Sequence, residues 1–320
     1  MTAAEPAPLP RPHPRISGVP GRSREQADEL DDAAATFTAA RPRLFGIAYR
    51  VLGSWSEAED VVQEAWLRWQ GTDREAVLNP AAFLATVTTR LCLNLAQSAR
   101  ARRESYVGPW LPEPVDTSAD PALSAEQGEE LELAVLLLLE KLTPTERAAY
   151  ILRESFAYPY PEIAAILQLS QAGARQLVSR GRKHVASGHS GQVDPAAHRR
   201  LLEAFLGAAQ TGDLATLESL LAADATSYSD AGGAARAAKV PVVGRDRVAA
   251  FVVAFRPRFW GGTRTEWVEA NGRPAVLITT GDATTALLTI SATDEGIHQI
   301  QWLMNPAKLD AFSRSRGRPA

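Results

Sequence analysis

A run of long hydrogen-bond donors lies between Ser170 and Lys183, on a segment that the sequence predicts to be a helix. Ser170 would N-cap this helix, because its side-chain oxygen can accept from a free amide of the first turn. A short apolar helix over residues 161–167 precedes it, so the pair fits a helix-turn-helix, whose second helix lies in the major groove of DNA. The candidate DNA contacts are Ser170, Arg175, Gln176, Ser179, Arg180, Arg182 and Lys183.

These residue types fit two different surfaces. Arg and Gln read the edges of bases through paired hydrogen bonds, and Arg and Lys neutralise phosphate. An ordinary amphipathic helical hairpin would carry the same residues on a basic face turned to solvent. The motif alone does not separate DNA recognition from a solvated face, so the rest of the chain has to decide between them.

The composition is that of a globular protein whose basic residues are confined to patches. The chain has 320 residues, 45% of them apolar and 22% charged, with a net charge of −3, which is enough for two or three domains. Cys92 is the only cysteine and the five histidines are scattered, so we expect no disulfide framework, metal site or cofactor. No apolar run reaches the roughly 18 residues of a membrane span, and no apolar signal core is present. We therefore expect a cytoplasmic protein without a membrane partner.

Two helical segments are joined by a proline-rich linker. Residues 1–31 lack periodicity and predict a disordered tail, whereas residues 32–107 and 124–190 carry helical patterns. Four prolines fall within residues 108–123, so this segment cannot be one helix or one central strand. We interpret it as a linker.

The pattern changes in residues 193–314. Two helical patterns are followed by several strand patterns, and Asn271-Gly272 and Gly281-Asp282 are hairpin turn signals. Helices followed by an antiparallel meander predict an α+β domain. Residues 315–320 would form a short tail.

An acidic helix is predicted over residues 57–70. Ser56 and Glu59 have the spacing of a capping box at its start. Asp60, Gln63 and Glu64 fall on one polar face, where two carboxylates and an amide can meet Arg side chains of a partner helix. The alternative is a solvated acidic face.

These segments together resemble a known family. Residues 58–69, AEDVVQEAWLRW, are similar to the acidic helix in region 2 of the extracytoplasmic-function (group IV) RNA polymerase sigma factors, and the helix-turn-helix is similar to region 4. In the linker, residues 110–114, WLPEP, resemble a marker of the subgroup that carries a fused C-terminal SnoaL-like domain. Residues 305–309, NPAKL, resemble a second marker of that subgroup, and residues 230–236 are an altered form of its DGGGR-type segment.

The resemblance implies a multidomain fold and two partners. The fold would be two all-α sigma domains, the region 2 helical bundle and the region 4 helix-turn-helix, followed by an α+β SnoaL-like cone with a curved antiparallel sheet. The partners would be core RNA polymerase, contacted at the β′ clamp helices and the β flap, and promoter DNA. The matching positions for the clamp helices are Asp60, Gln63 and Glu64.

The resemblance also divides the promoter between the two helical segments. Region 4 would read the −35 element through the candidates named above. Region 2 would open and read the −10 element through the helix from Pro80 to Arg103, whose basic end suits phosphate, and through the preceding loop at residues 73–79. The candidates on the helix are Arg90, Asn94, Arg100 and Arg103; the family usually has Asn in place of the first and often Asp in place of the second.

The third segment is expected to regulate the first two. In this subgroup the SnoaL-like domain acts in place of a separate anti-sigma protein, and the linker meets it. We expect Trp110 and Leu111 to contact this domain near residues 230–236 or 305–309. The candidate regulatory residues are Trp110, Leu111, Pro112, Glu113, Pro114, Asp230, Gly232, Gly233, Asn305, Pro306, Lys308 and Leu309.

Two other functions stay open. A pocket in the SnoaL-like domain could bind an unknown small ligand or act as an enzyme, because polyketide cyclases share this fold and a buried carboxylate can act as a base. No acid–base pair can be located by spacing, so we expect no catalytic activity. A repressor that binds DNA without polymerase is the other alternative. The residues that could line the pocket are Tyr228, Asp230, Glu266, Trp267, Glu269, His298 and Gln301.

Overall fold

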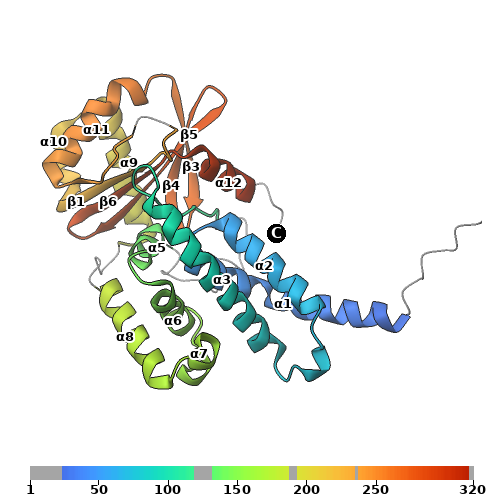
Figure 1. Cartoon of the computed structure of the whole chain (residues 1–320). Helices are drawn as coiled ribbons and strands as arrows, with labels where there is room; N and C mark the ends of the chain where they lie inside the picture. The colour runs from blue at the N-terminus through green and yellow to red at the C-terminus, as the bar shows by residue number, and fades with distance from the viewer. Residues whose placement is uncertain (1–23, 119–131, 187–192, 235–236, 317–320) are drawn as a thin grey trace, which may run out of the picture.

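The computed structural model describes residues 24–118, 132–186, 193–234 and 237–316. Figure 1 shows two groups of helices below a domain that combines a sheet with further helices. The predicted N-terminal tail was too long, because α1 (Arg24–Leu52) begins inside it. Residues 1–23 and most of the second half of the predicted linker lie outside the described residues.

The first helical domain consists of α1, α2 (Trp55–Gln70), the short η1 (Arg74–Ala76) and α3 (Pro80–Glu104). The capping box predicted at Ser56 is wrong. Ser54 is the N-cap of α2: its backbone is extended and its hydroxyl accepts a hydrogen bond from the Glu57 amide at 3.2 Å. Ser56 therefore lies within the first turn, and its polar groups are available for the linker.

The second helical domain consists of α5 (Leu133–Leu139), α6 (Pro144–Glu154), α7 (Tyr160–Leu167) and α8 (Gln171–Ala186). Thr143 and Glu146 form a capping box at the start of α6. Gln168 adopts a left-handed backbone between α7 and α8, and Ser170 accepts from the Gly173 amide at 3.1 Å. These local features produce the predicted helix-turn-helix.

The two helical domains share one apolar core. A continuous cluster of buried side chains extends from Ala33 in α1 to Val178 in α8. Helix α6 contacts both α1 and α3, and α7 contacts α3. Arg43 of α1 donates to the Phe156 carbonyl at 2.8 Å and stacks on Tyr158. In this arrangement the two helical domains form one packed body.

The third domain is built on a six-stranded sheet. Its strands are β1 (Leu221–Asp230), β2 (Val242–Val243), β3 (Thr263–Ala270), β4 (Arg273–Thr280), β5 (Ala283–Thr293) and β6 (Gly296–Leu303). The order is β2-β1-β6-β5-β4-β3. Strands β3 to β6 form the predicted antiparallel meander, but β1 pairs with β6 in parallel, so the sheet is mixed. The parallel pair is possible because the chain between β1 and β6 is long enough for a crossover.

Helices and the linker cover the two faces of this sheet. One face packs on α9 (Pro195–Thr211), α10 (Leu214–Leu220) and α11 (Arg245–Phe259). The other face packs on α12 (Pro306–Arg316) and on Leu111 of the linker. The C-terminal tail predicted from residue 315 is corrected, because α12 continues to Arg316 and Ser315 is buried. Within the described residues, no helix combines the length and apolar character needed to cross a membrane.

Candidate nucleic-acid interface and the linker between the domains

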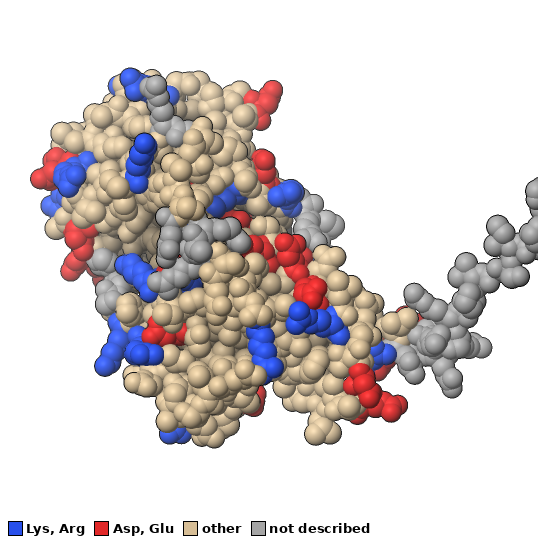
Figure 2. All heavy atoms as spheres, in the orientation of Figure 1, with Lys and Arg blue, Asp and Glu red and all other residues tan. Residues whose placement is uncertain are grey.

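The candidate DNA-reading residues of α8 all lie at the surface. Ala174, Val178 and Gly181 turn inward, and Gly181 lies so close to Tyr150 that a Cβ atom there would come within 3.0 Å of its ring. Because the inner face of α8 is packed this closely, the opposite face of the helix points to solvent. Figure 2 shows Lys and Arg side chains over α8 at the lower left of the molecule. The exposed candidates are Ser170, Arg175, Gln176, Ser179, Arg180, Arg182 and Lys183.

Three of these arginines have neighbours within their own domain. Arg180 pairs with Glu146 at 2.9 Å, and Arg182 pairs with Glu154 at 2.7 Å. The Arg175 guanidinium lies 5.4 Å from the centre of the Tyr160 ring. Exposed ion pairs stabilise a protein by about 0–1 kcal/mol, so phosphate can replace these partners at small cost.

The polar face of α2 is also exposed. Val61, Ala65 and Trp69 are buried on its inner face, which leaves the side chains of Asp60 and Gln63 in solvent. Glu64 is half-buried and pairs with Arg68 at 2.9 Å, one turn further along the helix. The three candidates for polymerase contact therefore lie on one accessible face, as the sequence predicted.

Two of the residues predicted to contact the −10 element join the two helical domains in this arrangement. Arg90 donates to the carbonyls of Ile166 and Ala165 at the end of α7, at 3.2 and 3.4 Å. Arg103 donates to the Leu52 carbonyl and pairs with Glu140. The last carbonyls of a helix have no partner within the helix and attract cations. This explains why both arginine side chains donate to carbonyls at helix ends. Asn94 is exposed, and the side chain of Arg100 lies outside the described residues.

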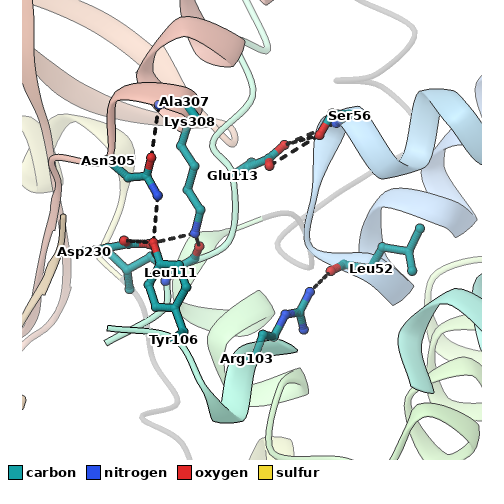
Figure 3. A network of polar contacts seen from close by, with 10 residues as sticks. All are labelled: Leu52, Ser56, Arg103, Tyr106, Leu111, Glu113, Asp230, Asn305, Ala307 and Lys308. Carbon is teal, nitrogen blue, oxygen red and sulfur yellow. Dashed lines mark hydrogen bonds and ion pairs between the residues drawn. The ribbon is translucent and has the colours of Figure 1, made fainter. Parts of the chain in front are cut away.

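Asp230, at the end of β1, is the centre of the contact between linker and third domain. Its carboxylate is fully buried and accepts from the Leu111 amide at 2.9 Å and from Lys308 Nζ at 2.7 Å. The Tyr106 hydroxyl donates to the other carboxylate oxygen at 2.5 Å. Lys308 also donates to the Leu111 carbonyl. Figure 3 shows these groups converging from the segment after α3, the linker, β1 and α12. We call Tyr106, Leu111, Asp230, Asn305 and Lys308 the latch.

Burial governs the charges of the latch. Burial lowers the pKa of Lys308, and the neighbouring Asp230 carboxylate partly restores it. Burial also raises the pKa of the Tyr106 hydroxyl, and its hydrogen bond to Asp230 raises it further, so this hydroxyl is a neutral donor. A buried charge is tolerated only when it is paired and hydrogen-bonded. The latch therefore depends on Asp230 and Lys308 being present together.

Asn305 and a glycine turn complete the latch. Asn305 Nδ2 donates to the Tyr106 hydroxyl at 2.7 Å, and its Oδ1 accepts from the Ala307 amide at the start of α12. Gly232 has a φ of 56°, and a Cβ atom there would lie 2.5 Å from Asn305 Nδ2. Another residue at this position would have a strained backbone and would displace the Asn305 side chain. Gly233 has a φ of 81° and packs against Val107.

Trp110 and Leu111 join the first helical domain to the third domain. The Trp110 ring lies between the Arg103 guanidinium, at 3.7 Å, and Lys308 Nζ, at 4.3 Å. It also covers Gly53, where a Cβ atom would lie 2.9 Å from the ring. Leu111 is buried in the apolar cluster on the sheet. The predicted contact of these two linker residues with the third domain is confirmed.

The rest of the motif is fastened to the first helical domain. Pro112 and Pro114 are buried. The Glu113 amide donates to the Gly53 carbonyl at 2.8 Å, and its carboxylate accepts from the Ser56 amide at 3.2 Å, as Figure 3 shows. Each residue of the WLPEP segment thus has a defined place.

A second contact between the domains was missed by sequence reasoning. Asn271, in the turn between β3 and β4, exchanges two hydrogen bonds with Val115, at 2.8 and 3.0 Å. Its side-chain amide also donates to the Tyr49 hydroxyl at 2.8 Å, and that hydroxyl donates to the Glu113 carbonyl at 2.6 Å. The Asn-Gly pair signalled a turn, but nothing in its pattern signalled that the turn is buried against α1 and the linker.

The polar residues predicted to line a pocket take part in separate contacts. His298 lies 2.7 Å from the Thr293 hydroxyl and 3.1 Å from the Asp224 carboxylate. Gln301 accepts from Thr289 at 2.8 Å, and Glu266 pairs with Arg316 at 2.6 Å. Asp230 belongs to the latch. In the part of the chain that the structure describes, no group of three His, Cys, Asp or Glu side chains is placed to hold a metal ion.

Comparison with known proteins gives matches for both helical domains. The chain matches the family model described as Sigma-70 region 2 over residues 36–103, and the model described as Sigma-70, region 4 over residues 132–185. It is 42% identical over 232 residues to the ECF RNA polymerase sigma factor SigJ of Mycobacterium tuberculosis, covering 71% of this chain and 74% of the relative. It is 33% identical over 293 residues to the probable ECF RNA polymerase sigma factor SigI of the same organism, covering 90% and 98%.

The likeness extends to the whole architecture. The crystal structure of Mycobacterium tuberculosis extracytoplasmic function sigma factor SigJ matches with a TM-score of 0.71 and 34% identity. The match covers 87% of this chain and 98% of that chain, so it includes the helical domains and the third domain. The multidomain fold expected from the sequence is confirmed.

Proposed function

Because the chain belongs to the extracytoplasmic-function RNA polymerase sigma factors, we propose that it binds core polymerase, recognises the −35 element through α8, and opens the −10 element through the first helical domain. We further propose that the third domain regulates this activity. It would hold the two helical domains in an arrangement that cannot engage both promoter elements. The observation that carries the regulatory proposal is the latch, which fixes the linker to β1 and α12.

We call the arrangement of the two helical domains in this structure the closed arrangement. It would be inactive in transcription because the two promoter elements are too far apart for both domains to reach them. The −35 and −10 elements lie about 25 base pairs apart, which is roughly 85 Å of duplex at about 3.4 Å per base pair. In the structure, Arg90 of α3 is within hydrogen-bonding distance of the end of α7, and both helical domains share one core. The two domains must therefore separate before they can bind both elements.

Contacts around the latch also stabilise the closed arrangement. Trp110 contacts Arg103 of the first helical domain and Lys308 of the third. Arg103 in turn pairs with Glu140, which also pairs with Arg147 of α6. A chain of contacts thus joins the third domain to both helical domains. Core polymerase shifts the balance towards the open arrangement only by its higher affinity for that arrangement.

Substitutions in α8 test recognition of the −35 element. With the polymerase holoenzyme, Arg175→Ala is expected to reduce promoter binding by about 1–3 kcal/mol and to relax specificity at one position if it contacts a base. If Lys183 contacts phosphate, Lys183→Ala should weaken binding to all sequences alike and flatten the salt dependence. Promoter affinities measured over a range of salt concentrations separate the two effects. Arg258→Ala, at an exposed position of α11, is the matched control, and unchanged binding by both α8 variants would contradict the assignment.

Removal of the third domain tests its regulatory role. A chain that ends at residue 190 is expected to transcribe more from promoters with both elements than the full chain does, in an assay with purified core polymerase. Trp110→Ala in the full chain should change transcription in the same direction, because the partly buried Trp110 ring packs between Arg103 and Lys308 and a Trp contributes a large apolar contact. Trp267→Phe, in β3 beside Arg199, serves as the control. Equal transcription by all four proteins at every promoter would show that the third domain does not regulate.

A further inference from the structure

One carboxylate joins the two helical domains through two arginines. Glu140, the C-cap residue of α5, pairs with Arg147 of its own domain and with Arg103 near the end of α3. The three side chains are mostly buried, with exposed fractions of 15% for Glu140, 6% for Arg147 and 18% for Arg103. Ion pairs that are shielded from water to this degree are screened less than pairs at the surface. This carboxylate therefore contributes to the contact between the two helical domains.

The structure of α5 alone does not account for a Glu at this position. The C-terminal end of a helix carries partial negative charge, so a carboxylate there is unfavourable by itself. The end of α1 provides a place for it. Gly53 leaves room, because a Cβ atom there would lie 3.2 Å from Glu140 Oε1. The carbonyls of Leu52 and Val51 accept from the two arginines, and Figure 3 shows the Leu52 contact. Contacts between the domains thus determine where this carboxylate lies.

The two ion pairs differ in what happens when the domains separate. Glu140 and Arg147 belong to the same helical domain, so their pair can persist in the open arrangement. Arg103 belongs to the other domain and loses the carboxylate from Nη1, while its Nη2 still donates to the Leu52 carbonyl. Opening therefore leaves a guanidinium that is held in place on one side and available on the other. Such a group binds phosphate through charged hydrogen bonds.

We propose that Glu140 is an internal competitor of promoter phosphate for Arg103. In the closed arrangement the carboxylate accepts from Nη1 of this arginine, and in the open arrangement a phosphate of −10 DNA takes its place. Both ligands are anionic oxygens that bind the same side of the guanidinium, so only one of them can bind at a time. Closure of the domains and binding of −10 DNA exclude each other at this residue. The inference rests on the proposed function, because it takes Arg103 as a −10 contact.

Breaking the pair from each of its two sides tests the competition. The probe is a fluorescein-labelled single strand of twelve thymidines, whose phosphates bind independently of sequence, titrated with the full chain without polymerase. Glu140→Gln keeps the shape of the side chain and releases Arg103, so it should raise the affinity about three- to tenfold, the range of one partly screened charged hydrogen bond. Arg103→Met breaks the same pair but removes the phosphate contact, so it should not raise the affinity.

Two further variants separate this pair from the effect of charge in general. Glu140→Asp keeps the negative charge but draws the carboxylate back by one methylene, so it should raise the affinity less than Glu140→Gln does. Glu162→Gln removes the same charge from an exposed position of α7 and should leave the affinity unchanged. Equal rises in Glu140→Gln and Arg103→Met would overturn the proposal, because a purely structural pair opens the chain in the same way from either side. Equal rises in Glu140→Gln and Glu162→Gln would also overturn it.

Transcription separates this inference from the proposed function. With purified core polymerase, Glu140→Gln should raise transcription from promoters with both elements, and Arg103→Met should lower it. Suppose that the chain ending at residue 190 differs from the full chain while both Glu140 variants bind the probe like the unmodified chain. The regulatory proposal then stands and the competition falls. If Arg103→Met transcribes as well as the unmodified chain, Arg103 is not a −10 contact and the competition also falls.

Discussion

Asp230→Ala should shift the chain from the closed towards the open arrangement and raise transcription from promoters with both elements. The substitution leaves Lys308 buried among Leu111, Trp110 and Tyr106 without a carboxylate partner. Removing one member of a buried ion pair costs about 3–5 kcal/mol, which corresponds to about 150- to 5,000-fold in the equilibrium. Transcription with purified core polymerase and the fluorescence of Trp110 would both report the change.

The second member of the pair provides the internal control for this result. Lys308→Met together with Asp230→Ala removes both charges, and replacing a buried pair by apolar groups is often neutral. The double variant should therefore transcribe less than Asp230→Ala alone. Asp282→Ala, in the exposed turn between β4 and β5, should behave like the unmodified chain. A folded Asp230→Ala variant with unchanged transcription would show that the latch does not hold the closed arrangement.

The double substitution Asp60→Ala and Glu64→Ala should weaken binding to core polymerase by at least about 30-fold. Both carboxylates lie on the accessible face of α2, and removing one partner of a buried interfacial charge pair costs about 2–5 kcal/mol. The fold should persist, because Val61, Ala65 and Trp69 supply the inner face of the helix. The measurement is a titration of labelled protein with core polymerase in the absence of DNA.

A second acidic pair provides the comparison. Asp73→Ala with Glu75→Ala removes the same charge from η1, beside α2, and should not affect polymerase affinity in this assay. Circular dichroism of both double variants confirms that helix content is retained. If the α2 and η1 pairs weaken binding equally, net charge and not the α2 face determines affinity.

Local chemistry made much of the fold predictable. Pro and Thr at the start of α6, Ser170 before α8 and the Asn-Gly turn each fix a backbone conformation within a few residues. The linker residues 110–114 were identified by their resemblance to a family marker. The sequence also predicted which two segments of the third domain they would contact, residues 230–236 or 305–309, but not the individual hydrogen bonds. These features depend on short stretches of chain, which sequence reasoning can read.

Contacts between distant segments were not predictable in the same way. Arg90 and Arg103 look like free cations in sequence, but carbonyls at the ends of α7 and α1 attract them. Asn271 shows no sign of its partner Tyr49, which lies 222 residues away in the chain. The parallel pairing of β1 with β6 depends on the crossover between them and not on either strand alone. Such features follow from the packing of whole domains.

The core shared by the two helical domains also has a consequence for solubility. Side chains such as Phe156 and Tyr158, which pack under Arg43 and Arg50, are covered only while α1 and α6 remain together. When the domains separate, water reaches apolar surface that the closed chain hides. An open chain without polymerase would therefore be prone to self-association. In the closed arrangement this apolar surface is buried between the two helical domains.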